Sequence, residues 1–236
     1  MADNDFFHHM LRGLGPQIQH RGEVIVIGLG RFGSALAGTL VDMGHEVLGL
    51  DLDGERIAEH SDLLTHVAEV DTTSVKALRQ LGVGDATTVV VCIGADVESS
   101  VLTTAAVSDL EVPNIWAKAM TEAHGRILAR VGAHNVVFPE AEMGSRVAHL
   151  VTGGMLEYVA LDEDFALVEM VAPRAIVGVP LGDSDLRSKY QVTIVCVKPS
   201  QGGFTYADRD TVLDRSDLVV VAGHRAHVER FADTDR

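Results

Sequence analysis

The sequence predicts an α/β protein, with a doubly wound parallel (Rossmann-like) sheet followed by a second, smaller α+β domain. Between residues 23 and 139, short apolar runs alternate six times with segments that carry apolar residues at helical spacing. This alternation is typical of parallel strands joined by right-handed crossover helices. Beyond residue 139 the apolar runs follow one another closely. A chain of 236 residues allows one large domain or two small ones, and its 47% hydrophobic content is sufficient for a real core.

The first strand is predicted at EVIVIGLG, a continuous apolar run that ends in glycines, as buried parallel strands do. Residues 31–43 follow at helical spacing and end before Gly44, a common helix terminator. The same reasoning predicts further strands at HEVLGLDLD, LLTHVAEVD, ATTVVVCIGA, NIWAKA and HNVVFP, and further helices at 55–60, 74–81, 97–110 and 122–131. These elements make up the predicted first domain, residues 22–139.

A helix at EAEMGSRVAHLVTG, ended by two glycines, is expected to connect the two domains over residues 140–154. Residues 155–236 form the predicted second domain. Its strands are expected at LEYVAL, FALVEMVA, QVTIVCVK, GGFTYA and DLVVVAG, and its helices at DSDLRSKY and HRAHVERF. Residues 1–21 form an N-terminal tail, in which FFHHMLRGLG is either a frayed end or a short helix that contacts a partner.

The net charge of −15 excludes some partners, because nucleic acids and anionic membranes both require a basic surface. Residues 1–140 hold 19 acidic and 9 basic residues, so bulk charge cannot attract an anionic ligand there. Cys92 and Cys196 lie within apolar runs, so we expect buried free thiols and a reducing, cytosolic compartment. No signal peptide pattern and no apolar run of 18 residues is found, so we expect no membrane span.

The motif GLGRFG at residues 28–33 is G-x-G-x-x-G, placed between the first strand and the first helix. In this setting Gly28 permits a tight turn, Gly30 lets phosphates approach the backbone, and Gly33 lets the helix pack against the strand. The helix N-terminus supplies free N–H groups and a partial positive charge. Asp51 ends the second strand, where an acid accepts hydrogen bonds from ribose hydroxyls and repels a 2′-phosphate. The motif therefore predicts a nucleotide site.

Three charged residues are further candidates for this site. Arg31, at the mouth of the loop, either meets a pyrophosphate or terminal phosphate or is an exposed helix residue. Lys118 ends the fifth strand and points into the ligand crevice, so we expect a phosphate contact. Glu140 follows the sixth strand. A carboxylate near phosphates usually needs a cation, divalent or Na⁺, between them, although an acid here also suits the helix dipole.

Neighbouring residues complete the predicted site. Asp71 and Thr72, at the end of the third strand, either border the adenine or cap the next helix. The other predicted nucleotide contacts lie beside the loop, beside Asp51 and at the end of the fourth strand, and they are Phe32, Leu52, Ile93, Gly94 and Ala95.

No reaction is evident for this site. His124 and His134 are candidate proton donors by position only, because neither has an acid at useful spacing. The sequence contains no nucleophile elbow and no Walker lysine, and two distant cysteines give no zinc spacing. We therefore expect a nucleotide-binding protein that is not an enzyme, with a small NAD-dependent oxidoreductase as an alternative.

Several segments resemble the RCK (KTN) family. VIGLGRFG, GHEVLGLD, NIWAKA and FPEAEMG are similar to the family's nucleotide-binding TrkA-N domain, and the unit ending in DLVVVAGHRAHVERF is similar to its TrkA-C domain. The resemblance covers about residues 22–232, in the family's domain order. Within the family, the chain looks most like the cytosolic regulatory subunits of Ktr-type potassium transporters.

The resemblance implies a function, partners and ligands. Such subunits form dimers and octameric rings beneath a membrane-embedded potassium-translocating subunit, so the chain would be cytoplasmic and peripheral to the membrane. ATP and ADP compete for their site and change the ring's shape, while NAD or NADH binds some relatives. The loop glycines, Asp51 and Lys118 keep the roles given above. The resemblance also implies that Arg31 reaches the γ-phosphate in the neighbouring subunit's site, and that Glu140 holds a cation between paired ATP molecules.

The resemblance also implies a second ligand site, in the second domain, and two alternative types of protein within the family. In relatives the C-terminal domain dimerises and binds cyclic di-AMP, and the matching stretch here is 181–190, with Leu181 and Arg187 as candidate contacts. Gly182 and Ser184 depart from the relatives' pattern there. A Trk-type subunit that responds to NAD(H) is an alternative. The RCK portion of a channel is another, against which the start at Met1 without a pore helix argues.

Overall fold

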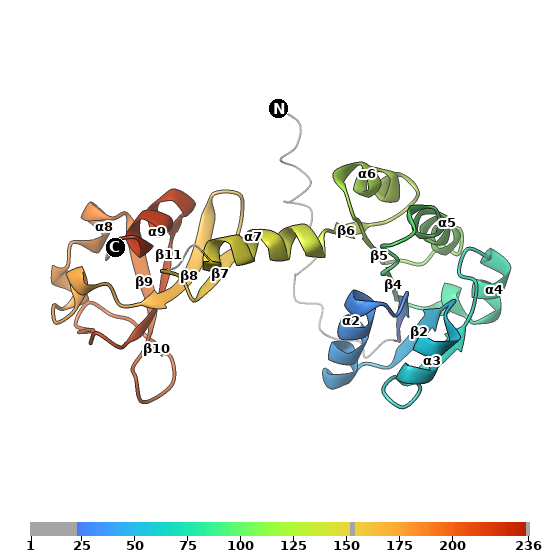
Figure 1. The fold of residues 1–236 in the computed structure, drawn as a ribbon, viewed down its shortest axis with the longest axis horizontal. Coiled ribbons are helices and arrows are strands. Elements are labelled where there is room, and N and C mark those ends of the chain that lie inside the picture. Colours follow the sequence, from blue (N-terminus) through green and yellow to red (C-terminus); the bar gives the residue numbers. More distant parts are fainter. Residues whose placement is uncertain (1–22, 152–153, 235–236) are drawn as a thin grey trace. The chain divides into compact units, whose positions relative to one another are not determined.

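The computed structural model describes residues 23–151 and 154–234 (Figure 1). These residues form two compact units that divide between Glu140 and Ala141. Each unit has its own sheet and its own hydrophobic core. The N-terminal tail predicted at residues 1–21 lies outside the described residues.

The first unit contains a six-stranded parallel sheet with the order β3-β2-β1-β4-β5-β6. The strands are β1 (Val24–Ile27), β2 (Val47–Asp51), β3 (His66–Glu69), β4 (Thr88–Val91), β5 (Ile115–Lys118) and β6 (Asn135–Val137). The chain adds strands outward from β1 on one side and then returns to add β4, β5 and β6 on the other. Such a switch point opens a crevice at the carboxyl ends of β1 and β4. The predicted doubly wound sheet is confirmed.

The crossover helices begin in two different ways. They are α2 (Arg31–Asp42), α3 (Gly54–His60), α4 (Val75–Gln80), α5 (Val97–Ser108) and α6 (Glu122–Arg130), and a short 3₁₀ turn, η1 (Val83–Asp85), lies before β4. The side chains of Asp53, Ser74, Asp96 and Thr121 cap α3 to α6 by accepting backbone hydrogen bonds. The N-cap of α2 is Gly30, which has no side chain to offer. The first turn of α2 is therefore open to a ligand.

Alternation along β1 supplies the two faces of this sheet. Ile25 and Ile27 belong to one buried cluster, while Val24 and Val26 belong to another. All four residues are at most 9% exposed, as expected for a central strand covered by helices on both faces. The apolar run that predicted this strand is thus explained by burial on both sides.

The connector helix α7 (Pro139–Val151) begins one residue earlier than the sequence predicts. Proline suits the first turn of a helix because its missing N–H has no partner there and its fixed φ is already helical. None of the described side chains of α7 is fully buried.

The second unit is a five-stranded antiparallel sheet with helices on one side. Its order is β10-β9-β11-β8-β7 (Figure 1). The strands are β7 (Glu157–Ala160), β8 (Phe165–Val171), β9 (Val192–Lys198), β10 (Thr205–Tyr206) and β11 (Leu218–His224), and the final helix is α9 (Arg225–Ala232). Phe231 of α9 is fully buried in this unit's core.

The helix expected at DSDLRSKY is interrupted. A 3₁₀ turn, η3 (Leu181–Asp183), precedes a short helix, α8 (Leu186–Lys189), and another 3₁₀ turn, η2 (Arg174–Ile176), lies upstream. Asp185, between η3 and α8, has a φ of 52°. This value lies in the left-handed region and prevents a continuous helix.

One expectation about the cysteines is wrong. Both thiols are free, and Cys92 is buried, but Cys196 is only half-buried. The register of β9 on β11 shifts between Val220 and Val221, so Val195 is an extra residue in the strand. This bulge puts both Val195 and Cys196 on the more open face. Among the described helices, none is both long and apolar enough to cross a membrane.

Candidate functional site

The glycine loop has the geometry that its motif predicts. Gly28 has a φ of 92°, and a Cβ there would lie 3.2 Å from the backbone of Cys92 and Ile93. A Cβ on Gly33 would lie 1.9 Å from the carbonyl oxygen of Gly28, so α2 approaches the loop as closely as the backbone permits. At Gly30 the nearest atom to an added Cβ is 3.9 Å away, which leaves this face open. The loop is therefore tight where it packs and open where a phosphate would enter.

Asp51 anchors the loop from the end of β2. Asp51 is 7% exposed, and its Oδ2 accepts a 2.6 Å hydrogen bond from the backbone N–H of Leu29. Oδ1 accepts from the N–H of Asp53 at 3.0 Å, and Arg56 donates to Oδ2 from 3.3 Å. A carboxylate has about four acceptor positions. The three bonds leave one of them for a ribose hydroxyl.

Two of the predicted charged residues meet on the other side of the crevice. Lys118 Nζ lies 2.5 Å from Glu140 Oε1 and 5.6 Å from the centroid of the Phe32 ring. The hydrogen bond from Lys118 is the main reason that the pKa of Glu140 is lowered, and the charge of Arg31 adds to the effect. The ends of β5, β6 and the first turn of α2 thus bring Arg31, Phe32, Lys118 and Glu140 together.

The end of β4 forms the floor beneath this group. A Cβ on Gly94 would lie 3.1 Å from Lys118 Nζ, so a side chain at this position would displace the lysine. Cys92 is buried beside the loop, and burial raises the pKa of its thiol to about 12. Ile93 is half-buried and Ala95 is exposed. The Cys92 thiol is therefore an inert packing group at neutral pH.

Glu140 is the predicted cation ligand, and it would need help from outside this set. Among the described residues, no group of three or more His, Cys, Asp or Glu side chains is placed to hold a metal ion. A cation at Glu140 would therefore take its other ligands from phosphate oxygens or water.

The predicted residues after β3 are placed differently from one another. Thr72 is 7% exposed, and its hydroxyl hydrogen-bonds Thr103 of α5 at 2.9 Å, so it faces the interior. Asp71 is exposed and accepts from both the N–H and the hydroxyl of Thr73, which lowers the pKa of its carboxyl. The alternative that this segment caps the next helix is wrong, because Ser74 caps α4. Asp71 remains accessible to a ligand.

Leu52 and the two histidines complete the placement of the predicted residues. Leu52 is 70% exposed beside Asp51, where an apolar surface can pack on a base. The Nδ1 atoms of His124 and His134 accept hydrogen bonds from the backbone N–H groups of Met120 and Ile115. The Nδ1 atoms of both imidazoles thus hold the backbone at or near the ends of β5, whereas Nε2 of His124 is buried without a hydrogen-bond partner among the described residues.

Arg56 is the residue that sequence reasoning missed. It lies on α3, with Nη1 3.3 Å from Asp51 Oδ2 and Nε 3.4 Å from Asp53 Oδ2. The signal was present, because Asp53 and Arg56 are three residues apart at the start of a predicted helix, a spacing at which opposite charges meet.

Two family models cover most of the chain. TrkA-N matches residues 24–139, and TrkA-C matches residues 165–234.

The chain belongs to the TrkA-N/TrkA-C family. The resemblance that the sequence motifs carry is therefore confirmed, in the expected domain order. Among similar proteins are the Ktr system potassium uptake proteins C and A of Bacillus subtilis (strain 168). The first is 34% identical over 89% of this chain and 95% of the relative, and the second is 33% identical over 87% and 93%.

Solved structures share the fold of this TrkA-N/TrkA-C chain. The crystal structure of the GsuK RCK domain has a TM-score of 0.63 at 20% identity, over 91% of this chain and 48% of that one. The GsuK channel bound to NAD has a TM-score of 0.60 at 19% identity, over 89% of this chain and 38% of that one.

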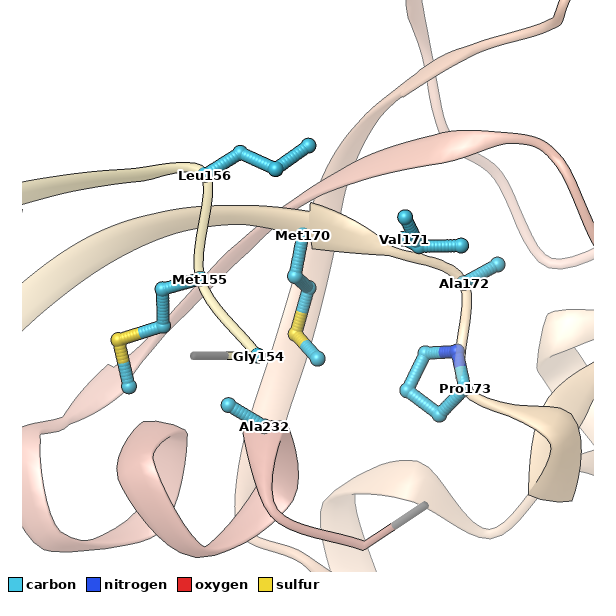
Figure 2. A pocket seen from close by; sticks show the side chains of 8 residues that line it. All are labelled: Gly154, Met155, Leu156, Met170, Val171, Ala172, Pro173 and Ala232. Atoms are coloured by element: carbon cyan, nitrogen blue, oxygen red, sulfur yellow. The ribbon is translucent and has the colours of Figure 1, made fainter. Parts of the chain in front are cut away.

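The TrkA-C unit contains an apolar pocket of about 250 Å³, shown in Figure 2. Its walls come from the segment before β7, the end of β8 and the end of α9, and they include Met155, Met170 and Pro173. The eight lining residues are all glycine or apolar, so the pocket offers no side chain for a phosphate.

The residues predicted to bind cyclic di-AMP lie elsewhere in the TrkA-C unit. Leu181 packs partly against the core, and its N–H donates to the carbonyl of Thr211. Arg187 is exposed on α8, with Nε 3.2 Å from the Thr193 hydroxyl. Binding of cyclic di-AMP at these residues stays a prediction.

Proposed function

We propose that this chain is the cytosolic regulatory subunit of a potassium transporter and that its TrkA-N domain senses adenine nucleotides. Near-full-length similarity to proteins named for Ktr potassium uptake is the observation that carries the proposal. The open first turn of α2 and the free acceptor position on Asp51 support nucleotide binding in this chain itself. The subunit binds and responds, and it has no reaction to catalyse.

ATP and ADP are the ligands that the charge arrangement favours. A nucleotide can bias a conformational equilibrium only by binding one state better than the other. ATP differs by its γ-phosphate, and Arg31 at the loop mouth supplies a cation for it. Glu140 with a divalent cation or Na⁺ would offset the charge of paired ATP molecules. Lys118 Nζ lies 2.5 Å from Glu140 Oε1. A phosphate that reaches Lys118 would therefore compete with Glu140 for the ammonium group and free the carboxylate.

The proposed assembly is the one that the family resemblance implies. Dimers form through the nucleotide-binding domain and build an octameric ring that contacts a membrane-embedded potassium-translocating subunit. The subunit itself is cytoplasmic and peripheral to the membrane. The connector helix α7 begins at Pro139 and carries Glu140, the proposed cation ligand, in its first turn, so it is the element that would carry the change onward.

A second candidate ligand is NAD(H). A solved structure is of the GsuK channel bound to NAD, and Asp51 suits the adenosine ribose of either ligand. A Trk-type response to NAD or NADH is therefore the alternative within the same fold.

Substitution of Arg31 tests the sensing mechanism. In Arg31→Ala, calorimetry should show a larger loss of affinity for ATP than for ADP, about tenfold or more for ATP, because only ATP carries the γ-phosphate. Arg79→Ala, at an exposed arginine on α4, is the matched control and should bind both ligands as the unaltered chain does.

Equal losses for ATP and ADP in Arg31→Ala would contradict the sensing mechanism. Titration of NAD and NADH into the unaltered chain decides between the two ligand classes. Failure of all four nucleotides to bind would overturn the proposed function.

A further inference from the structure

Arg56 lies between the ribose acid and the phosphate loop. Its guanidinium reaches Asp51 Oδ2 with Nη1 at 3.3 Å and Asp53 Oδ2 with Nε at 3.4 Å. The side chain is 47% exposed, so one side of the guanidinium faces solvent. The carboxylates of Asp51 and Asp53 thus hold the Arg56 guanidinium at the rim of the crevice.

The same guanidinium borders the open face of the loop. Nη1 of Arg56 is the atom nearest to the position of a Cβ on Gly30, at 3.9 Å. Gly30 is the residue whose missing side chain admits phosphate to the backbone. Arg56 therefore marks the boundary between the ribose, which Asp51 would hold, and the first phosphate, which the loop would hold.

Arg56 has enough N–H donors to bind the two carboxylates and a phosphate at the same time. A guanidinium carries five N–H donors, and the contacts to Asp51 and Asp53 use two of them. The others remain for phosphate oxygens, for which the planar guanidinium is well shaped. Asp51 in turn keeps an acceptor position for ribose, so ligand binding does not require the ion pair to break.

We propose that Arg56 binds the phosphate next to the ribose, the group that AMP, ADP, ATP and NAD share. The inference rests on the proposed nucleotide site. It divides the work between two arginines: Arg56 supplies affinity for every adenine nucleotide, whereas Arg31 supplies discrimination by the γ-phosphate. A purely structural Arg56, which only orients Asp51, would affect the ribose instead.

Arg56→Gln tests the proposal, with adenosine, AMP, ADP and ATP as probes in competition against a fluorescent adenine nucleotide. AMP, ADP and ATP should each lose about ten- to a hundredfold in affinity, as expected for a charge-assisted contact, with the ATP-to-ADP ratio unchanged. Adenosine, which lacks phosphate, should stay within about twofold. Arg56→Lys should restore much of the loss, and Arg79→Gln should behave as the unaltered chain.

Four outcomes overturn the inference. A loss for adenosine equal to that for AMP would make Arg56 a positioning residue for Asp51. A changed ATP-to-ADP ratio would place it at the γ-phosphate. Unchanged affinities in Arg56→Gln, beside normal binding by the unaltered chain, would remove Arg56 from the site while leaving the proposed function intact. If the unaltered chain binds none of the probes, the proposed function fails and this inference with it.

Discussion

Gly33 and Gly38 lie five residues apart on α2, but only Gly38 has room for a side chain. A Cβ on Gly33 would lie 1.9 Å from the Gly28 carbonyl oxygen, whereas a Cβ on Gly38 would have no atom within 4 Å. Gly33→Ala should therefore lower the free energy of unfolding by about 1–3 kcal/mol or more, through forced movement of α2. Gly38→Ala should raise it by about 0.5–1 kcal/mol, because glycine is a poor helix former.

Urea unfolding of the two alanine variants measures this difference. Equal effects of the two substitutions would show that α2 does not approach the loop as closely as the structure has it. Nucleotide binding should be reduced in Gly33→Ala and unchanged in Gly38→Ala, because only the former moves the start of the helix.

The positions of site residues were predictable from the sequence where a motif determines the backbone conformation. G-x-G-x-x-G specifies where a chain must turn and where it must pack, and Gly28 and Gly33 lie accordingly. Side-chain direction is a different matter. Thr72 turns inward to Thr103, and Arg56 turns back to Asp51, because partners on other elements determine both.

At the scale of elements, the first turn of α7 is held by the ion pair between Lys118 and Glu140. The pKa of Glu140 is lowered by this contact, so the pair stabilises the folded chain above the ordinary carboxyl pKa of about 4.5. That stabilisation is lost as the pH falls through the lowered pKa of the folded state. Glu140→Gln should therefore lower the melting temperature at pH 7, and the difference from the unaltered chain should shrink below about pH 4.5.

Thermal unfolding of the nucleotide-free chain at pH 7 and pH 3.5 tests the pair. Glu122→Gln, at an exposed acid on α6 whose Arg126 partner is 4.0 Å away, is the control and should change little at either pH. A difference for Glu140→Gln that grows on acidification would contradict the lowered pKa.

Most element boundaries follow from local signals, and the exceptions have non-local or backbone causes. Caps such as Asp96 and Thr121 lie where the apolar pattern begins, so those helices were predictable. The helix expected at residues 183–190 is interrupted at Asp185, and the apolar pattern of the sequence does not predict the positive φ of this residue. The bulge at Val195 belongs to the pairing of β9 with β11, which the strand pattern alone does not contain.

For the whole molecule, the net charge of −15 predicts a response to salt. Like charges repel one another across a compact chain, and added salt screens that repulsion. The melting temperature of the nucleotide-free protein should therefore rise between 10 mM and 200 mM NaCl, roughly the range over which the Debye length falls from 30 Å to below 10 Å.

A charge-reversed variant provides the control for this salt effect. Replacing the exposed acids Asp42 and Asp62 by lysine reduces the negative charge, so the rise in melting temperature should be smaller. A fall in melting temperature with salt in the unaltered chain would show that local ion pairs outweigh the overall repulsion.

The order of strands was predictable in the first unit and not in the second. A strand–helix–strand rhythm permits few arrangements, because parallel crossovers are right-handed and ligand sites lie at the switch point. Five closely spaced strands permit many pairings. The order β10-β9-β11-β8-β7 depends on contacts between distant segments, such as β8 with β11.

In the first unit, the N-terminal half of the sequence forms one half of the sheet and the C-terminal half forms the other. The strands β1 to β3 come from residues 24–69 and β4 to β6 from residues 88–137, and the two sets pair only where β1 meets β4. The glycine loop leaves β1 and Ile93 follows β4, so the proposed ligand lies across this seam. A chain cut between β3 and β4 would give two fragments that each carry part of the site, and adenine nucleotide would favour their reassembly. The domain is thus a natural starting point for a split reporter of nucleotide levels.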